Sequence, residues 1–314
     1  MNVLVIGGTG FIGSHVTRLL CEKGHSVAIV HRGTTPAEIS GDVRQVFGSR
    51  DDLVDLQPQL APFKPTVVLD IIPYTERQAQ ELMNTFRGVA ERVVALSSAD
   101  VYRNYDGFRG QPTSLPDPVP LAEDAPLRET LYPYRGLGLP LLWADDYDKI
   151  LVERVVMADA ELPGTVLRLP AVYGPGDMHN RTGQYLERMR TEQRVLMTPE
   201  QSTWRWTRGY VVNVAAAIVC AVVDDRAAGR LYNVGEASAL TEREWVEEIA
   251  KALDWAGEVA VTGAEDRAEP LHLPFDFRYE LMIDTTRIRD ELGYSESVGR
   301  QEALRRTVEW DRRQ

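Results

Sequence analysis

Three glycines near the start of the chain have a spacing that suits the binding of phosphate groups. Gly7, Gly10 and Gly13 follow one another at G-x-x-G-x-x-G spacing, directly after a short apolar run over residues 3–6. In such a turn one glycine lets the chain leave a strand sharply, one lets the backbone approach a pyrophosphate, and one lets the following helix pack closely. The N-terminus of that helix presents free N–H groups and a positive dipole end to the phosphates.

The elements around these glycines are those of a dinucleotide-binding unit. Residues 3–6 fit a strand buried on both faces, apolar residues repeat at helical spacing from Ile12 to Leu20, and a second buried strand is expected over 27–30. A strand, a glycine turn, a helix and a strand in this order predict a dinucleotide site. The residues expected to line this part of the site are Gly7, Thr9, Gly10, Phe11, Ile12 and Gly13.

The residues that end the second strand bear on the choice of dinucleotide. NAD-binding proteins of this type place an acidic side chain there for the ribose 2′-hydroxyl, whereas this chain has His31 and Arg32. A guanidinium is well suited to a 2′-phosphate. We therefore expect NADP rather than NAD as the cofactor.

The composition is that of an ordinary globular protein, with 44% hydrophobic and 26% charged residues. A net charge of −12 disfavours nucleic acid as a partner, and no apolar run is long enough to cross a bilayer. The two cysteines, Cys21 and Cys220, indicate neither a disulfide framework nor a metal site. A core strand at the very N-terminus leaves no room for a signal peptide, so we expect a cytoplasmic protein.

The first half of the chain alternates strand-like and helix-like segments, which predicts an α/β fold with a doubly wound parallel sheet. Strands are expected over 43–47, 66–72, 92–98 and 164–170, and helices over 76–87 and 145–160. Residues 103–140 lack periodicity and are rich in proline and glycine. A segment of this kind between a strand end and a helix favours a partly ordered loop that covers a ligand crevice.

Six motifs resemble the short-chain dehydrogenase/reductase superfamily, in its extended epimerase/dehydratase branch. They are GGTGFIGSH at 7–15, LSSADVY at 96–102, Lys149 four residues before Glu153, LRLPAVYGPGD at 167–177, RGYV at 208–211 and LYNVG at 231–235. The resemblance implies a Rossmann-type nucleotide domain over 1–167, joined by 208–235, and a smaller C-terminal substrate lobe over 168–207 and 236–314. It also implies a homodimer formed through the helices at 76–87 and 145–160.

In that family a Ser or Thr, a Tyr and a Lys act together on a hydroxyl or carbonyl group of the substrate. The resemblance assigns Ser98 to a hydrogen bond with the substrate oxygen, and Lys149 to the nicotinamide ribose and to lowering the pKa of the tyrosine. It also points to Asp100, because family dehydratases carry an acidic residue just after the Ser or Thr. Ser49 stands where many members place an Asp beside adenine.

The tyrosine position departs from the family pattern. Tyr-x-x-x-Lys would put both side chains on one helix face, but Asp145 stands four residues before Lys149. With a reference pKa of about 3.9, Asp145 would hold no proton at neutral pH, although it could orient Lys149. Tyr147 is only two residues before Lys149 and on a helix would point elsewhere. The other phenols available nearby are Tyr102, Tyr132 and Tyr134.

Several residues in the second half are candidates for substrate contacts. Nucleotide-sugar enzymes of the family carry an Asn where this chain has Ala171, which weakens a nucleotide-sugar interpretation. Arg208, in contrast, stands where many members clamp a diphosphate, and Trp206 beside it would stack on a sugar or form part of the lobe core. The candidate substrate-binding residues are Arg168, His179, Arg181, Trp206 and Arg208.

Two classes of function stay open. The first is an NAD(P)-dependent epimerase, dehydratase or reductase that acts on a sugar-like or anionic small molecule, with Asp145 in place of the catalytic tyrosine. The second is a non-catalytic NAD(P)-binding sensor or binding protein of the atypical short-chain dehydrogenase type. A phenol close to Ser98 would favour the enzyme, and a site without a proton donor there would favour the binding protein.

Overall fold

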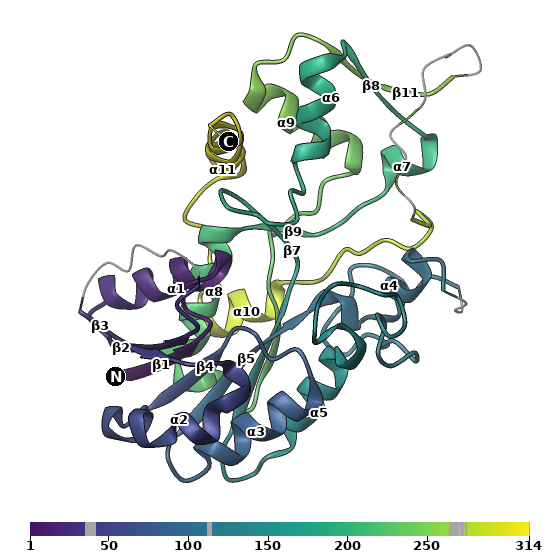
Figure 1. Cartoon of the computed structure of the whole chain (residues 1–314). Helices are drawn as coiled ribbons and strands as arrows, with labels where there is room; N and C mark the ends of the chain where they lie inside the picture. The colour runs from purple at the N-terminus through teal and green to yellow at the C-terminus, as the bar shows by residue number, and fades with distance from the viewer. Residues whose placement is uncertain (35–41, 112–114, 264–269, 271–272, 274, 314) are drawn as a thin grey trace.

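The centre of the molecule is a parallel sheet of seven strands. The computed structural model describes residues 1–34, 42–111, 115–263, 270, 273 and 275–313 (Figure 1). The strand order is β10-β6-β5-β4-β1-β2-β3, and every neighbouring pair runs parallel. These strands are β1 (Asn2–Ile6), β2 (Ser26–His31), β3 (Val43–Phe47), β4 (Val67–Asp70), β5 (Arg92–Ser98), β6 (Gly164–Leu169) and β10 (Leu231–Asn233).

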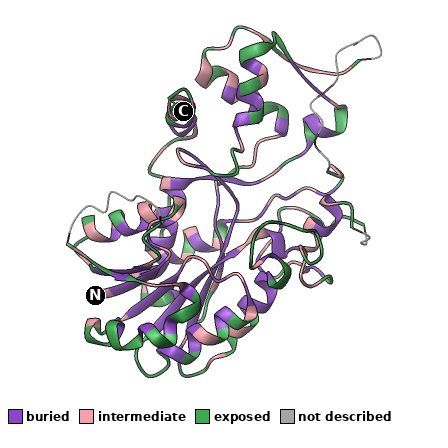
Figure 2. Cartoon of the chain, in the orientation of Figure 1, coloured by how far each residue is buried: buried purple, intermediate pink, exposed green. Residues whose placement is uncertain are grey.

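Helices cover both faces of this sheet. Side chains alternate along β1, so Val3 and Val5 pack in one apolar core with α1 and α8, whereas Leu4 and Ile6 pack in another with α2, α3 and α5. Apart from the edge strand β3, the strands are therefore largely buried on both sides (Figure 2). The helices are α1 (Phe11–Glu22), α2 (Leu53–Leu60), α3 (Glu76–Phe86), α5 (Lys149–Ala158), α8 (Val211–Val223) and α10 (Thr286–Leu292), the last packed against α8 and β10. This arrangement confirms the doubly wound, Rossmann-type α/β fold.

A smaller lobe lies beside the sheet and is built from the second half of the chain (Figure 1). Strands β8 and β11 pair in parallel within the lobe, and β7 pairs with β9 where the chain passes between the lobe and the sheet. The elements are β7 (Ala171–Tyr173), β8 (Arg194–Met197), β9 (Arg208–Tyr210), β11 (Glu258–Val261), α6 (Gly183–Thr191), α7 (Pro199–Thr203), α9 (Glu242–Leu253) and α11 (Arg300–Asp311). No helix among the described residues combines the length and apolarity needed to span a membrane.

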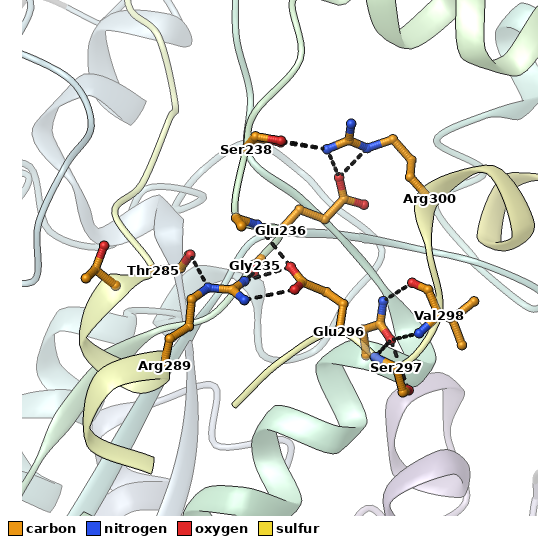
Figure 3. Close-up of polar contacts among 12 residues, drawn as sticks. Gly235, Glu236, Ser238, Thr285, Arg289, Glu296, Ser297, Val298 and Arg300 are labelled. Carbon is orange, nitrogen blue, oxygen red and sulfur yellow. Dashed lines mark hydrogen bonds and ion pairs between the residues drawn. The ribbon is translucent and has the colours of Figure 1, made fainter. Parts of the chain in front are cut away.

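Ion pairs at the end of β10 fix the chain between α10 and α11 (Figure 3). Arg289 of α10 pairs with Glu296 at 2.7 Å and donates to the carbonyl oxygen of Gly235 at 2.9 Å. Arg300 at the start of α11 donates to Glu236 at 2.8 Å. Asn213 of α8 adds hydrogen bonds to the backbone of residues 297 and 298. These contacts tie α11, which packs on α9 of the smaller lobe, to the end of the central sheet.

The covering segment contains more structure than expected, while the helix after it contains less. Residues 103–108 form the short helix α4 (Arg103–Phe108), and residues 112–114 of the segment lie outside the described residues. The helix expected over 145–160 begins only at Lys149, because the Asp148 side chain accepts a hydrogen bond from Ile150 N at 2.9 Å and caps it there. A separate 3₁₀ turn, η4 (Ala144–Asp146), precedes it.

The contact between the glycine turn and α1 gives the first prediction. A Cβ on Gly13 would lie 2.1 Å from the Gly7 carbonyl oxygen and 2.9 Å from the Gly8 Cα. Gly13→Ala must therefore push the helix off the turn, and we expect a loss of about 1–3 kcal/mol of stability, the usual cost of overpacking. The measurement is the midpoint of thermal or urea unfolding.

Gly10→Ala is the matched control, because a Cβ on Gly10 would meet no atom closer than 4.0 Å. This variant should unfold close to wild type. Equal losses of stability in Gly10→Ala and Gly13→Ala would contradict the packing argument.

Candidate active site

The glycine turn forms a cradle at the start of α1. Gly7 has a φ of +87°, a left-handed conformation that favours glycine. Gly10 is exposed and caps α1 without a side-chain hydrogen bond, and no acidic residue stands in the first helical turn. The N–H groups of that turn are thus available to a pyrophosphate, so the residues present fit a dinucleotide. Half-buried side chains beside the cradle are those of Thr9, Phe11 and Ile12.

The ends of β2 and β3 carry the next residues predicted to contact the dinucleotide. The His31 ring lies 4.8 Å from the Phe47 ring, and its Nε2 is 3.1 Å from Gln45 Oε1. Phe47 was not identified from the sequence, yet 63% of it is exposed, and a flat ring of this kind can stack on a base. The Ser49 hydroxyl accepts a hydrogen bond from Asp51 N at 3.2 Å and so caps a short 3₁₀ turn (Arg50–Asp52).

Arg32 is exposed at the same end of the sheet. Among the described residues, no ion pair or hydrogen bond of its side chain is found. Burial raises the pKa of Tyr74, and the charge of Arg32 acts against that rise, so the guanidinium lies within electrostatic reach of this phenol. Arg32 is therefore a cation that a ligand phosphate can approach.

Lys149 is buried where β4 and β5 end. Its Nζ donates hydrogen bonds to the carbonyl oxygens of Pro73, at 2.7 Å, and Leu96, at 2.9 Å. Burial lowers the pKa of Lys149 to about 8, although the charges of Asp100 and Asp70 act in the opposite direction. The ammonium group is thus held in one place and titrates close to neutral pH.

A phenol and a carboxyl group meet beside this lysine. The Tyr147 hydroxyl donates to Asp100 Oδ2 at 2.7 Å, and both side chains are buried. Burial raises the pKa of each group, and the charge of Asp100 raises that of Tyr147 further. Asp100 N donates to the Ser98 hydroxyl at 3.2 Å, while Lys149 Nζ lies 5.9 Å from the centre of the Tyr147 ring. The structure therefore brings Ser98, Asp100, Tyr147 and Lys149 together.

This position of Tyr147 corrects the expectation that its side chain points away from Lys149. The expectation assumed a helix over both residues, but Tyr147 precedes α5 and has an extended backbone, with φ −64° and ψ 123°. Asp145 lies in the turn η4, is exposed, and accepts a hydrogen bond from Gly136 N at 2.9 Å. Its carboxylate is thus engaged with the covering segment, and the geometry gives no support to Asp145 as the replacement for a catalytic tyrosine.

Two further phenols extend the site from Tyr147. The Tyr134 ring lies 5.0 Å from the Tyr147 ring, and the Tyr134 and Tyr105 hydroxyl oxygens are 3.2 Å apart. The guanidinium of Arg109 lies 4.7 Å from the centre of the Tyr134 ring. Tyr105 and Arg109 were not identified from the sequence, because α4 is too short to give a periodic pattern. Tyr102, in contrast, is fully buried and donates to Asn233 Oδ1 at 2.6 Å.

The arginines predicted to bind substrate are all paired with carboxylates. Arg168 is buried, pairs with Glu153 at 2.7 Å and donates to the carbonyl oxygen of Glu123 at 2.9 Å. This corrects its assignment as a substrate contact, because its guanidinium is enclosed by protein groups. Arg181 is half-buried and pairs with Asp177 at 2.9 Å, and His179 beside it is exposed.

Arg208 and Trp206 lie together near β9. The guanidinium of Arg208 pairs with Glu242 at 2.5 Å and is buried. Trp206 is half-buried, with its ring 5.5 Å from that of Trp204 and 6.0 Å from that of Phe108. The tryptophan thus belongs to an aromatic cluster of the smaller lobe and still presents part of its surface.

Comparison with known proteins agrees with this fold. The chain matches the model of the NAD dependent epimerase/dehydratase family over residues 3–134 and 144–235. It is 28% identical to 2′-dehydrokanamycin reductase from Streptomyces kanamyceticus, over 86% of this chain and 72% of that protein. It is 22% identical to UDP-N-acetyl-α-D-glucosaminuronate decarboxylase from Bacillus cytotoxicus, over 98% of this chain and 97% of that protein.

Among solved structures, the chain resembles MoeE5 in complex with UDP-glucuronic acid and NAD. The two share 25% identity and a TM-score of 0.70, with 100% of this chain and 99% of MoeE5 covered. The family model covers more than half of the chain. The chain therefore belongs to the NAD dependent epimerase/dehydratase family.

Proposed function

We propose that this protein is an NAD(P)-dependent oxidoreductase that acts on a hydroxyl or carbonyl group of a sugar-like small molecule. The observation that carries the proposal is the Tyr147 hydroxyl, 2.7 Å from Asp100 and next to Ser98 and Lys149. The name of the reductase from Streptomyces kanamyceticus, which describes reduction of a carbonyl on a sugar derivative, supports the same reaction class. In this proposal Tyr147 takes the role that the sequence pattern had left to Asp145.

The proposed mechanism divides the work between cofactor and side chains. A dinucleotide would be held at Gly7, Gly10, Gly13 and Lys149 and, when bound, would supply or accept the hydride. Tyr147 gives its proton to the substrate oxygen during reduction, or takes it during oxidation. During oxidation the proton that Tyr147 takes passes on to the Asp100 carboxylate, and during reduction protonated Asp100 returns a proton to the Tyr147 phenolate. Burial raises the pKa of Asp100, which favours its protonated form. The cation of Lys149 favours the ionised form of Tyr147, and Ser98 orients the substrate oxygen.

The non-catalytic alternative is less favoured by these contacts. A protein that only binds the cofactor does not need a phenol, a carboxyl group and a lysine buried together, as Tyr147, Asp100 and Lys149 are. Perturbed titratable groups of this kind gather at functional sites more often than elsewhere. A non-catalytic sensor or binding protein is the expected conclusion only if removal of the Tyr147 hydroxyl changes no reaction.

Three finer features belong to the same proposal. We expect NADP to be preferred, because Arg32 is exposed at the end of β2 and no carboxylate stands at His31. We expect a homodimer through α3 and α5, which pack together and leave Gln80, Asn84 and Met157 exposed. We also expect the smaller lobe, 168–207 and 236–314, to bind substrate in a cytoplasmic protein, consistent with two free cysteines.

The role of Tyr147 is tested by Tyr147→Phe. Loss of a general acid or base typically costs between about a hundredfold and ten-thousandfold in rate, so we expect kcat to fall by at least about a hundredfold. Binding of NADPH should stay within threefold of wild type, about 0.7 kcal/mol. The measurement is cofactor oxidation or reduction with a panel of sugar carbonyls and alcohols.

Asp145→Asn is the control for the same assay, since Asp145 is exposed and bonded to Gly136 N. It should keep the wild-type rate. A large loss in Asp145→Asn with little change in Tyr147→Phe would return the catalytic role to Asp145.

The titration of Lys149 predicts a pH dependence of cofactor binding. Its pKa of about 8 lies below the ordinary value, so the ammonium loses its proton as the pH rises through about 8. Affinity for NADPH should weaken over that range. The Lys149→Met variant should bind NADPH about 10 to 100-fold more weakly than wild type at pH 7, which is the usual contribution of a charge-assisted hydrogen bond. Its affinity for NADPH should not fall as the pH rises through about 8. An unchanged slope in the variant would assign the titration to another group.

The cofactor preference is tested by Arg32→Ala. Removing a guanidinium that pairs with a phosphate should weaken NADPH binding by about 10 to 100-fold, whereas NADH binding should change by less than about threefold. Fluorescence titration of both reduced cofactors with wild type and variant measures this difference. Equal losses for NADPH and NADH would rule out a 2′-phosphate contact at Arg32.

A further inference from the structure

The arginine that the family resemblance assigns to a diphosphate is already occupied by groups of the protein. Arg208 is 7% exposed, and its Nη2 lies 2.5 Å from Glu242 Oε2. Its Nη1 donates to the carbonyl oxygen of Trp206 at 3.4 Å, and its guanidinium carbon lies 4.4 Å from the centre of the Trp245 ring. A carboxylate, a carbonyl oxygen and an aromatic ring thus enclose the cation.

Glu242 is itself held firmly in place. It is 2% exposed, it lies in the first turn of α9, and its Oε1 accepts the hydroxyl hydrogen bond of Tyr185. The positive end of the α9 dipole adds to the stabilisation of its negative charge. The carboxylate is therefore held in position beside Arg208.

A diphosphate at Arg208 would have to displace this carboxylate. Taking the cation from a buried pair leaves the other charge uncompensated, which is strongly unfavourable. The displaced or neighbouring carboxylate would also repel the negative phosphates. Arg168 and Arg181 offer no alternative of the same kind, because they are paired with Glu153 and Asp177, which are 5% and 8% exposed.

A series of aromatic rings lies instead between Tyr147 and the smaller lobe. It runs from Tyr147 through Tyr134 and Tyr105, whose ring lies 6.2 Å from that of Phe108, to Trp206 at 6.0 Å from Phe108. Tyr105, Tyr134 and Trp206 are only half-buried. Rings with one polar edge suit a substrate that carries apolar C–H faces and hydroxyl groups.

We propose that the substrate of this site is a sugar-like molecule that carries no diphosphate, and that Glu242 is the residue that excludes diphosphates by neutralising Arg208. The inference rests on one part of the proposed function, which is that the substrate binds beside Tyr147. The proposed substrate therefore differs from the ligand in the MoeE5 complex, UDP-glucuronic acid, which carries a diphosphate.

The test uses calorimetric titration of UDP-glucuronic acid into the full-length protein saturated with NADPH. We expect no binding by wild type up to about 1 mM. Glu242→Gln, which keeps the shape of the side chain and frees the charge of Arg208, should bind UDP-glucuronic acid at least tenfold more tightly than wild type. Thermal unfolding and NADPH binding on the same samples show whether the variant is folded.

Glu247→Gln is the matched control, because it removes a half-buried carboxylate from the same helix, where Glu247 pairs with Arg243 and not with Arg208. It should leave UDP-glucuronic acid binding unchanged. Micromolar binding by wild type that Arg208→Ala abolishes would overturn the inference, as would a folded Glu242→Gln variant with no gain. The proposed oxidoreductase function fails separately, through a Tyr147→Phe variant that retains full activity.

Discussion

The buried carboxylate of Asp148 joins three parts of the candidate active site. Its Oδ1 accepts a hydrogen bond from Ile150 N and caps α5, and its Oδ2 accepts one from Tyr132 N in the covering segment at 2.7 Å. Arg128 pairs with it at 3.3 Å and also donates, through Nε, to the carbonyl oxygen of Asp100 at 2.6 Å. Both side chains of this ion pair are fully buried, so neither charge can be left unpaired without a large cost.

The positions of Lys149 and Tyr147 follow from the cap that Asp148 forms at the start of α5. Because α5 begins at Lys149, the lysine stands in the first turn and reaches the carbonyl oxygens at the ends of β4 and β5. Tyr147 stands outside the helix, and its extended backbone directs the ring to Asp100. A Tyr-x-Lys spacing thus brings a phenol and an ammonium group together without the helical turn that Tyr-x-x-x-Lys requires. The spacing of these two residues differs from Tyr-x-x-x-Lys because α5 begins at Lys149 and leaves Tyr147 outside the helix.

The features that the sequence predicted are those set by residues close together in the chain. The glycine turn and the strands of the central sheet are local patterns, and the structure contains each of them. The start of α5 was not predictable in this way, because Asp145, Asp146 and Asp148 are each acceptable N-cap residues. The choice among them depends on Arg128, twenty residues earlier in the chain. The pairing of Arg208 with Glu242 was not predictable for the same reason, because the two residues are thirty-four positions apart and no local sequence pattern joins them.

The glycine turn and the proposed substrate region therefore provide positive charge by different means. At the glycine turn, the free N–H groups of α1 attract phosphates with no cationic side chain and no counter-charge to displace. On the substrate side, Arg168, Arg181 and Arg208 are each matched by a carboxylate, in a chain with 47 acidic and 35 basic residues. Buried pairs of this kind add little net stability, but they fix the position of both partners. In the proposed function, the backbone of the glycine turn would bind the cofactor phosphates, and the pairing of the arginines would leave recognition of the substrate to hydroxyl groups and aromatic rings.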